Sequence, residues 1–330
     1  MKTLSFATRL NSFASRPQAA WPGLKGKPTV LQMVERAARV GGLTHLDLNY
    51  PDHLGGGAAQ TRRQIADLGL AVNGLAMRYY TNPAFKLGAF TNPDPGVRQE
   101  AIDLTKRGID AAMQAGAPLM TLWLGQDGFD HAFQADYARL WQQELDGIRE
   151  VAAHDPGCAI SIEYKPNEPR SYSLLPDCAT TLLAIREIGL PNLGVTIDFA
   201  HSLYADEQPA CAATLIARHS RLLGVHLNDG YGKRDDGLMV GAVHTIKTIE
   251  LLRQIRRDGY VGPIYFDTFP DTTGLDPVRE CEVNIATVKR MMEVVDRLDR
   301  SNRLEEAVAA QNAVEAQAIV QAALMAPDAT

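Results

Sequence analysis

Four apolar segments of the sequence each end in a side chain that can bind a metal or a proton: Glu163 after AISI, Asp198 after GVTI, His226 in GVHL and Asp267 after IYF. A charge late in a buried strand costs several kcal/mol unless it is paired or binds a metal. One such residue is readily explained by a salt bridge or by the start of a capped helix. Four in succession indicate a shared functional site, and carboxylate together with imidazole suits a divalent metal such as Mn²⁺, Co²⁺ or Zn²⁺.

Lys165 follows Glu163 by two residues in AISIEYK. Because side chains alternate along a strand, we expect these two to point to the same side. Lys165 is then either an ion-pair partner of Glu163 or Glu168, or a cation beside a reacting group. Asp198 and His201 are three residues apart across the turn from strand to loop, so both can face one centre.

The segment that begins at His226, HLNDGYGKRDDGLMVG, contains two further acids, Asp235 and Asp236. They either belong to an ordinary solvated turn or fold back over the site and hold another ion. Two metals that share Asp198 would grip vicinal oxygens of a polyol or a hydroxy carbonyl compound, and sugars present such oxygens.

These residues follow a regular alternation of strand and helix patterns. Eight apolar, β-rich runs predict strands at residues 4–8, 45–50, 71–79, 119–125, 159–165, 194–201, 222–229 and 263–269. Helical periodicity fills the intervals at 29–40, 58–68, 96–115, 132–153, 175–188, 207–219, 244–258 and 277–298. Eight such units predict a closed (β/α)₈ barrel over residues 1–298, with a doubly wound open sheet as the alternative. In such a barrel the carboxyl ends of the strands meet at one mouth, which would collect the charged residues.

The overall composition excludes several classes of protein. A net charge of −6 with scattered Lys and Arg leaves no basic stripe for nucleic acid. The four cysteines show no CxxC spacing, which argues against a zinc knuckle or a disulfide framework. No stretch approaches the ~18 apolar residues of a membrane span, and the first residues lack the apolar core of a secretory signal. We therefore expect a cytoplasmic protein without nucleic-acid or membrane partners.

Residues 299–330 form a predicted helical extension of the barrel. The segment LEEAVAAQNAVEAQAIVQAALM is rich in Ala, Glu and Gln, with Leu, Val and Ile at helical spacing. We expect one extra helix that lies against the barrel or against a neighbouring subunit.

Taken with their order along the strands, several short motifs resemble the xylose isomerase-like TIM barrels, a superfamily of divalent-metal sugar isomerases and epimerases. The similarity is greatest to the L-rhamnose isomerase and xylose isomerase branch. It covers most of residues 75–270 and rests on FKLGAFTNPDPGVRQEAID (85–103), LWLGQDG (122–128), EYKPNEP (163–169) and FDTFP (266–270). The resemblance implies an enzyme that acts on a monosaccharide and is assembled as a homodimer or homotetramer. The lack of an anion-binding nest of glycines and basic residues favours an unphosphorylated sugar.

The resemblance also implies roles for individual residues. Glu163, Asp198, His226 and Asp267 would surround one metal, and Asp198 or His201 would join Asp235 at a second. The metal would be Mn²⁺, or alternatively Co²⁺, Mg²⁺ or Zn²⁺, with one or two ions per subunit. Lys165 matches a lysine that hydrogen-bonds the oxygen at the reacting carbon, and Trp123 matches a tryptophan that walls the sugar pocket.

Two positions depart from the pattern of that branch. Gly237 stands where the rhamnose isomerase pattern has a further acid, and the third strand ends in MRYY without the histidine that contacts the far end of the sugar. Arg78 in this segment, with Lys86 and Arg170, is expected to contact either sugar hydroxyls or a neighbouring subunit.

The reaction that these residues predict is the interconversion of an aldose and a ketose by a metal-assisted 1,2-hydride shift. Lys165 would support charge on oxygen, Glu163 and Asp235 would complete the catalytic group, and Trp123 and His201 would contact the substrate. The alternative is a ketose 3-epimerase of the D-tagatose 3-epimerase type, with proton abstraction between Glu163 and Asp267. A metal phosphoesterase would need more histidines and a basic face, and a non-catalytic sugar-binding barrel would lack metal ligands.

Overall fold

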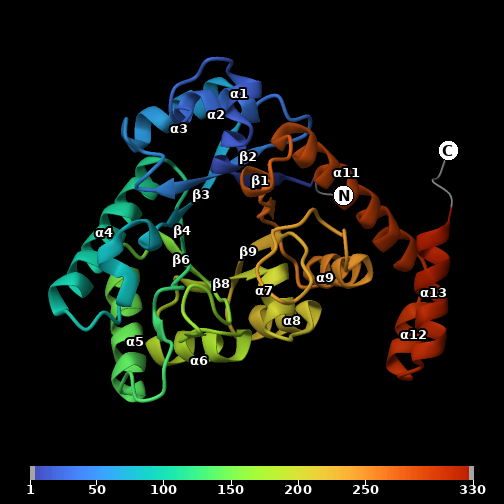
Figure 1. Cartoon of the computed structure of the whole chain (residues 1–330). Coiled ribbons are helices and arrows are strands. Elements are labelled where there is room, and N and C mark those ends of the chain that lie inside the picture. The colour runs from blue at the N-terminus through green and yellow to red at the C-terminus, as the bar shows by residue number, and fades with distance from the viewer. Residues whose placement is uncertain (1–3, 327–330) are drawn as a thin grey trace.

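A computed structural model describes residues 4–326 of the chain, and its centre is a closed barrel of eight parallel strands (Figure 1). The strands are β1 (Phe6–Arg9), β2 (His45–Tyr50), β3 (Ala71–Met77), β4 (Leu119–Leu122), β6 (Ala159–Glu163), β8 (Leu193–Asp198), β9 (Leu222–Leu227) and β10 (Ile264–Phe266). Because β1 pairs with both β2 and β10, the sheet has no edge, and the open-sheet alternative is wrong. All eight predicted strands are present, but several end earlier than predicted.

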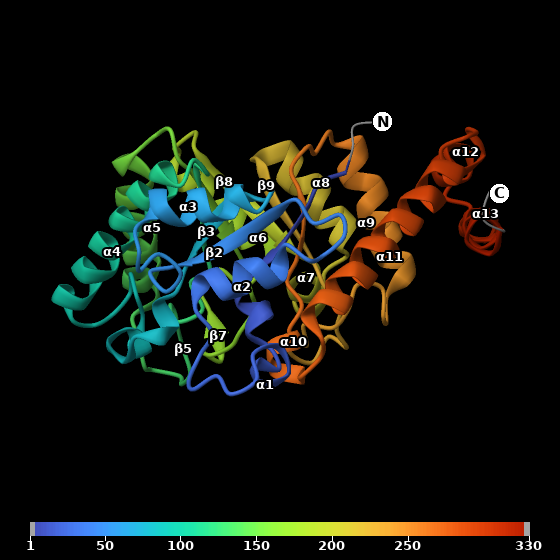
Figure 2. The ribbon, with the colours of Figure 1, turned by 90° about the horizontal axis from the view of Figure 1, so that it is seen from above.

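Eight helices follow the strands and form the outer ring seen in Figures 1 and 2. They are α2 (Val30–Ala37), α3 (Ala58–Asp67), α4 (Pro95–Gln114), α5 (Tyr137–His154), α6 (Cys178–Ile188), α8 (Pro209–His219), α9 (Thr245–Arg257) and α11 (Pro277–Leu298). Four of them begin after an aspartate whose side chain accepts a hydrogen bond from the first turn: Asp94, Asp136, Asp177 and Asp276. These N-caps fix where each helix starts, and the predicted (β/α)₈ barrel is confirmed.

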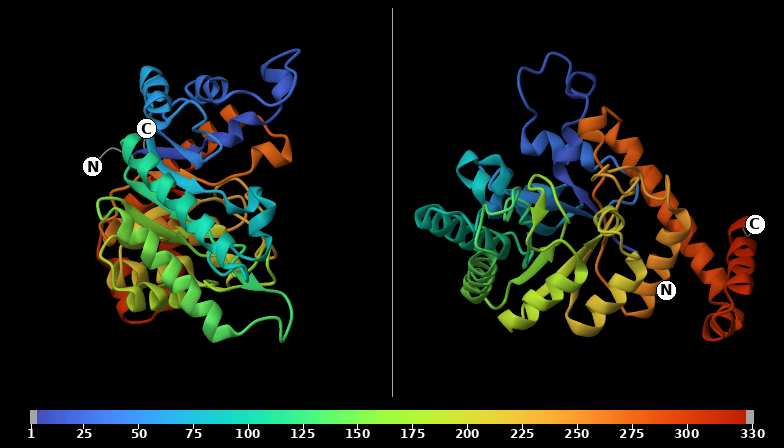
Figure 3. Two further views of the ribbon diagram at one scale, coloured as in Figure 1. Left: turned by 90° about the vertical axis from the view of Figure 1, so that its left-hand side faces the viewer. Right: turned by 60° about the horizontal axis from the view of Figure 1, so that its bottom comes forward.

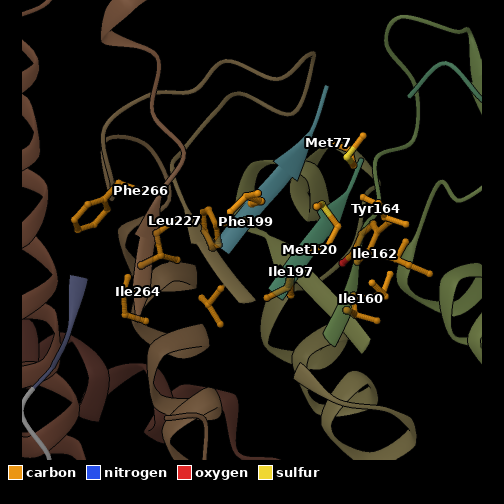
Figure 4. Packing of buried hydrophobic residues seen from close by; sticks show 14 of the residues in the cluster. Met77, Met120, Ile160, Ile162, Tyr164, Ile197, Phe199, Leu227, Ile264 and Phe266 are labelled. Carbon is orange, nitrogen blue, oxygen red and sulfur yellow. The ribbon is translucent and has the colours of Figure 1, made fainter. Parts of the chain in front are cut away.

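Alternation along the strands separates the packed core from the polar interior. Ser161 Oγ and Thr196 Oγ1 lie 2.6 Å apart on neighbouring strands, and the residues two positions further on are Glu163 and Asp198. The intervening residues, such as Ile162 and Ile197, are buried in the hydrophobic cluster shown in Figure 4. Strand side chains therefore present apolar groups to one face and the charged groups to the other.

The loops at the mouth carry short elements of their own. They include α1 (Pro17–Ala20), α7 (Phe199–Tyr204), α10 (Pro270–Thr273) and a two-stranded antiparallel sheet of β5 (Gly128–Phe129) and β7 (Tyr172–Ser173). Three 3₁₀ turns, Leu10–Ala14, Tyr79–Thr81 and Pro83–Leu87, follow the first and third strands. Within the described residues, no helix combines the length and apolar character that crossing a bilayer requires.

The predicted C-terminal helical extension is present, but it consists of two helices, α12 (Arg303–Ala309) and α13 (Ala313–Met325), rather than one. Gln311 adopts a positive φ of 50°, and the Asn312 side chain accepts a hydrogen bond from Glu315 N, which starts a new helix. Figures 2 and 3 show the pair projecting from the barrel beside α11. The Arg297 side chain on α11 donates to the carbonyl of Ala323 at 2.9 Å, so the extension packs on the last barrel helix.

Candidate metal centre and active site

Four side chains from neighbouring strands converge at the mouth of the barrel. Each of Glu163, Asp198, His226 and Asp267 offers one ligand atom, and these four atoms lie within 4.8 Å of one another. The residues stand at the ends of β6 and β8, late in β9 and directly after β10, and Asp198 pairs with His226 in register. The structure thus brings together all four residues predicted for the first metal.

Asp198 is fully buried and is held by several donors. Its Oδ1 accepts a hydrogen bond from His201 N at 2.9 Å, which makes Asp198 the N-cap of α7 and ends β8 there. The predicted strand 194–201 is therefore too long, because the cap begins a helix. Asn228 Nδ2 lies 3.2 and 3.0 Å from the two carboxylate oxygens, and Asn228 Oδ1 accepts from Ala200 N at 2.9 Å. Sequence reasoning gave Asn228 no role.

Glu163 and His226 form a buried pair in the same cluster. His226 Nδ1 lies 3.2 Å from Glu163 Oε1, and the His226 ring packs 4.1 Å from the Tyr265 ring. Burial opposes charge on Glu163, but the positive charge of His226 and then of His201 lowers its pKa to about 2. Burial likewise opposes charge on His226, but Glu163 raises its pKa to about 9. The acids of the cluster therefore hold the imidazole in its protonated form where no metal replaces the proton.

A second polar group lies beside this cluster and contains Lys165, His201 and Asp235. Asp235 Oδ2 is 3.1 Å from both Lys165 Nζ and His201 Nε2. His201 Nδ1 lies 3.1 Å from the carbonyl of Tyr164, which is consistent with donation from Nδ1 and leaves Nε2 facing Asp235. The other oxygen, Asp235 Oδ1, is buried without a hydrogen-bond partner among the described residues. His201 connects this group to the first cluster, because its Nδ1 lies 3.7 Å from Glu163 Oε1 and 3.9 Å from Asp198 Oδ1.

In this second group, the pKa of each residue depends strongly on the charges of its neighbours. Burial disfavours charge on His201, but Asp198 and Asp235 raise its pKa to about 10. Burial also acts on Lys165, yet Asp235 and Glu168 together raise its pKa above the usual value. Burial acts to raise the pKa of Asp235, but His201 and Lys165 hold that pKa well below its ordinary range. These interactions favour the ammonium form of Lys165 and the carboxylate form of Asp235.

The remainder of the loop after β9 does not supply a further ligand. Asp236 accepts a hydrogen bond from Tyr231 N at 2.9 Å and pairs with Arg234 at 2.8 Å, so it serves the loop itself. Gly237 has a left-handed φ of 56°, and a Cβ there would fall on the ring of Phe269. An acid at Gly237 would therefore require a different loop conformation.

A cavity of about 220 Å³ joins the two groups. Lys165 Nζ lies 5.3 Å above the Trp123 ring, and Trp123 and Tyr80 form an edge-to-face pair with centroids 5.5 Å apart on the cavity wall. The lining also includes residues that the sequence analysis did not select: Arg9, Asp47, Tyr265 and Phe269. Arg9 could have been recognised from the sequence as a charged residue at the carboxyl end of a strand, because it ends β1 just as Asp198 ends β8.

The donor set fits a divalent cation. Three carboxylates and one imidazole with mutually close ligand atoms are typical of Mn²⁺, Co²⁺, Mg²⁺ or Zn²⁺ sites, and no thiolate is present to favour a softer metal. For a second ion, the nearest donors would be Asp235 Oδ1, which has no partner among residues 4–326, and His201 Nε2, which lies 3.1 Å from Asp235 Oδ2 and would have to lose its proton. Burial raises the pKa of Asp198 to about 7, a cost that a bound cation would relieve.

Both the sequence and the fold resemble those of known proteins. The family described as "Xylose isomerase-like TIM barrel" matches residues 34–290. Xylose isomerase from Thermus thermophilus is 27% identical over 212 residues, which make up 62% of this chain and 55% of that protein. The chain thus spans about half the length of this curated relative.

Two solved structures share the architecture. A xylose isomerase domain protein from Alicyclobacillus acidocaldarius has a TM-score of 0.66 at 19% identity, covering 89% of this chain and 100% of that chain. A D-tagatose 3-epimerase-like protein has a TM-score of 0.70 at 17% identity, covering 89% and 98% of the two chains. At this level of identity the similarity shows the fold alone.

Proposed function

The chain belongs to the xylose isomerase-like TIM barrel family, and we propose that it is a divalent-metal-dependent sugar isomerase that interconverts an aldose and a ketose. The observation that carries the proposal is the position of Lys165. This cation lines the same cavity as Glu163, His226 and Asp267 of the four-residue cluster, and it is held by Asp235 at 3.1 Å and Glu168 at 2.9 Å. The substrate class is an unphosphorylated monosaccharide.

Glu163, Asp198, His226 and Asp267 would hold one metal, and His201 with Asp235 would contribute to a second. When bound, such a metal supplies a Lewis acid that polarises a carbonyl oxygen and stabilises an alkoxide. Asn228 keeps Asp198 oriented by donating to both of its oxygens. A ligand held in this way by its outer contacts is presented in one geometry.

The remaining residues of the cavity would control charge, protons and water. The Lys165 ammonium would donate a hydrogen bond to the oxygen at the reacting carbon and stabilise negative charge there. Asp235 Oδ1 is buried and has no hydrogen-bond partner among the described residues, so when no second metal occupies it this oxygen would accept a hydroxyl proton or bind a water that carries it. The Trp123 ring would pack on the apolar face of the sugar and keep water from the carbon that receives the hydride.

A ketose 3-epimerase is the alternative, and one observation favours it. Glu163 and Asp267 come from different strands and both face the cavity, as two acid/base groups on opposite sides of one carbon would. The similarity to a D-tagatose 3-epimerase-like protein agrees with that arrangement at the level of the fold. However, Asp267 already lies 3.8 Å from the Arg9 guanidinium and within the ligand cluster, which limits its reach toward a substrate carbon.

The test is a panel of free aldoses and ketoses incubated with the protein and Mn²⁺ and scored by the identity of the product. We expect aldose and ketose pairs, and we expect activity to disappear after chelation and to return with Mn²⁺. Products that are only C3 epimers would assign the alternative function. Full activity after complete removal of metal would exclude both reactions as described.

A further inference from the structure

Arg78 is a basic residue that lines the cavity. Its backbone is held by hydrogen bonds, whereas its side chain has no acidic partner among the described residues. Its N–H donates to the carbonyl of Tyr50 at 3.1 Å, and its carbonyl accepts from Thr81 Oγ1 at 3.0 Å. The guanidinium carbon lies 5.5 Å from the Tyr80 ring. Arg78 Nε is buried and has no hydrogen-bond partner, and no acid among residues 4–326 forms an ion pair with this side chain.

Besides Arg78 and the histidines, two basic side chains line the cavity. Unlike Arg78, both are paired with acids. Lys165 is paired with both Glu168 and Asp235. Arg9 lies 3.4 Å from Asp271 and also donates to the carbonyl of Thr268. Leaving a buried donor unsatisfied costs free energy, so an unpaired guanidinium inside a substrate cavity indicates a partner that arrives with the ligand.

The barrel order places Arg78 across the mouth from the strands that carry the metal cluster, although its positive charge also acts to lower the pKa of Glu163. The cluster comes from β10, β9, β8 and β6, and the next strands round the barrel are β4, which leads to Trp123, and then β3, which leads to Arg78. A sugar whose reacting carbons lie at the cluster and whose ring or chain passes Trp123 would therefore present its far end to Arg78. The acid on the neighbouring strand, Asp47, already accepts a hydrogen bond from Asn73 at 2.7 Å.

We propose that Arg78 binds a carboxylate at the end of the substrate remote from the metal, so that the preferred substrate is an acidic monosaccharide such as a uronate. This inference rests on the proposed isomerase function and names the class of sugar. The planar guanidinium fork matches a carboxylate in a bidentate pair. A phosphate at this end is disfavoured, because the cavity of about 220 Å³ offers Arg78 as its one unpaired cation among the described residues.

The experiment compares an aldose with the uronate that differs from it only at the terminal carbon, such as glucose and glucuronate. Binding of each to the Mn²⁺-loaded protein is measured by calorimetry, and isomerisation is measured in parallel. We expect the uronate to bind the wild type ~10- to 100-fold more tightly than the aldose, as a charge-assisted hydrogen-bonded pair would allow. Arg78→Gln should abolish this difference, and an unchanged circular dichroism spectrum and melting midpoint would show that the variant is folded.

Lys86→Gln is the matched control. Lys86 is exposed in the adjoining outer cavity, so its removal deletes one positive charge near the mouth but no contact with the inner cavity. This variant should retain the preference for the uronate. If both variants lost the preference for the uronate equally, the preference would come from the overall positive charge near the mouth. That result would overturn the assignment of the carboxylate site to Arg78.

Three other outcomes have distinct meanings. If aldoses are isomerised and uronates are neither bound more tightly nor converted faster, the inference is wrong and the isomerase proposal stands. If no sugar is converted but Arg78-dependent uronate binding is measured, the isomerase proposal is wrong and the carboxylate site stands. If neither conversion nor any Arg78-dependent difference is found, both are wrong.

Discussion

Replacing Asn228 with alanine tests whether the hydrogen bonds around Asp198 serve the metal site. The substitution removes the amide that contacts both oxygens of the buried Asp198 carboxylate, and it leaves the Ala200 N–H without its acceptor. A lost bond to a charged group contributes about 1.5–3 kcal/mol, and an orphaned buried donor costs about 1–3 kcal/mol. We therefore expect the free energy of unfolding to fall by about 3–5 kcal/mol. At about 0.7 kcal/mol per degree for a chain of this size, the melting midpoint should fall by roughly 4–7 °C.

The more specific expectation for Asn228→Ala concerns metal binding. Loss of a partner that orients a metal ligand typically costs about 10- to 100-fold in affinity, so Mn²⁺ should bind the variant that much more weakly. The assay is a direct Mn²⁺ titration at a temperature where the variant is folded, with urea unfolding measured alongside. Because stability and affinity are read separately, a merely destabilised barrel can be recognised.

Asn192→Ala is the matched control for that experiment. Asn192 is also buried, and its side chain donates to the carbonyls of Ala152 and Cys158 at 2.9 Å, but it precedes β8 at the end of the barrel opposite Asp198. It should be destabilised to a similar degree with unchanged Mn²⁺ affinity. The reasoning is refuted if Asn228→Ala binds Mn²⁺ like the wild type, or if both variants weaken binding equally.

Three further predictions concern catalysis, pH and the C-terminal helices. Lys165→Met should lower kcat by about 10²- to 10³-fold with little change in KM, because the lost hydrogen bond would act on charge that develops in the transition state. An equal loss of kcat/KM that came only from a higher KM would contradict that role. Glu144 is fully buried with neither carboxyl oxygen partnered in the described structure, and burial followed by the charge of Asp127 raises its pKa well above the usual value. The contribution of Glu144 to stability is fully present below the pKa of its carboxyl in the unfolded chain, which is about 4.3. This contribution is lost as the pH rises toward the higher pKa of the carboxyl in the folded chain. In urea unfolding, the free energy of unfolding of Glu144→Gln relative to that of the wild type should therefore increase as the pH rises from 5 to 8. A difference that does not change with pH would count against this prediction. A chain ending at Arg300 should keep its Mn²⁺ affinity and melt a few degrees lower, since α12 and α13 supply no residue to the cavity; loss of metal binding on truncation would be contrary to this division of the chain.

The fold and the convergence of the four-residue cluster could be predicted from sequence because two regularities coincide. Apolar runs mark the strands, and a parallel barrel brings the carboxyl ends of all its strands together. Glu163, Asp198, His226 and Asp267 follow from these two facts without knowledge of any distance. The strand ends were less predictable: Asp198 both ends β8 and caps α7, and the sequence alone does not show which of the two roles fixes the boundary.

Other residues became visible only through tertiary contacts. Asp47 lies inside an apolar run, and its place in the cavity depends on how β2 pairs with β1 and β3. The obstruction at Gly237 arises from Phe269, a residue 32 positions further along the sequence. The unpaired state of Arg78 depends on which acids lie elsewhere in the barrel. Each of these properties concerns pairs of residues distant in sequence, which local patterns do not encode.

Lys165 shows why an ion pair and a catalytic role need not be alternatives. The sequence left open whether this residue is a structural partner of an acid or a cation beside the substrate. In the structure it is paired with Asp235 and Glu168, and it also lines the cavity next to Trp123. Without the two acids, burial would lower the pKa of the lysine and favour the neutral amine. Because the ion pairs raise that pKa and fix the ammonium in place, they supply the charged donor that the proposed reaction requires.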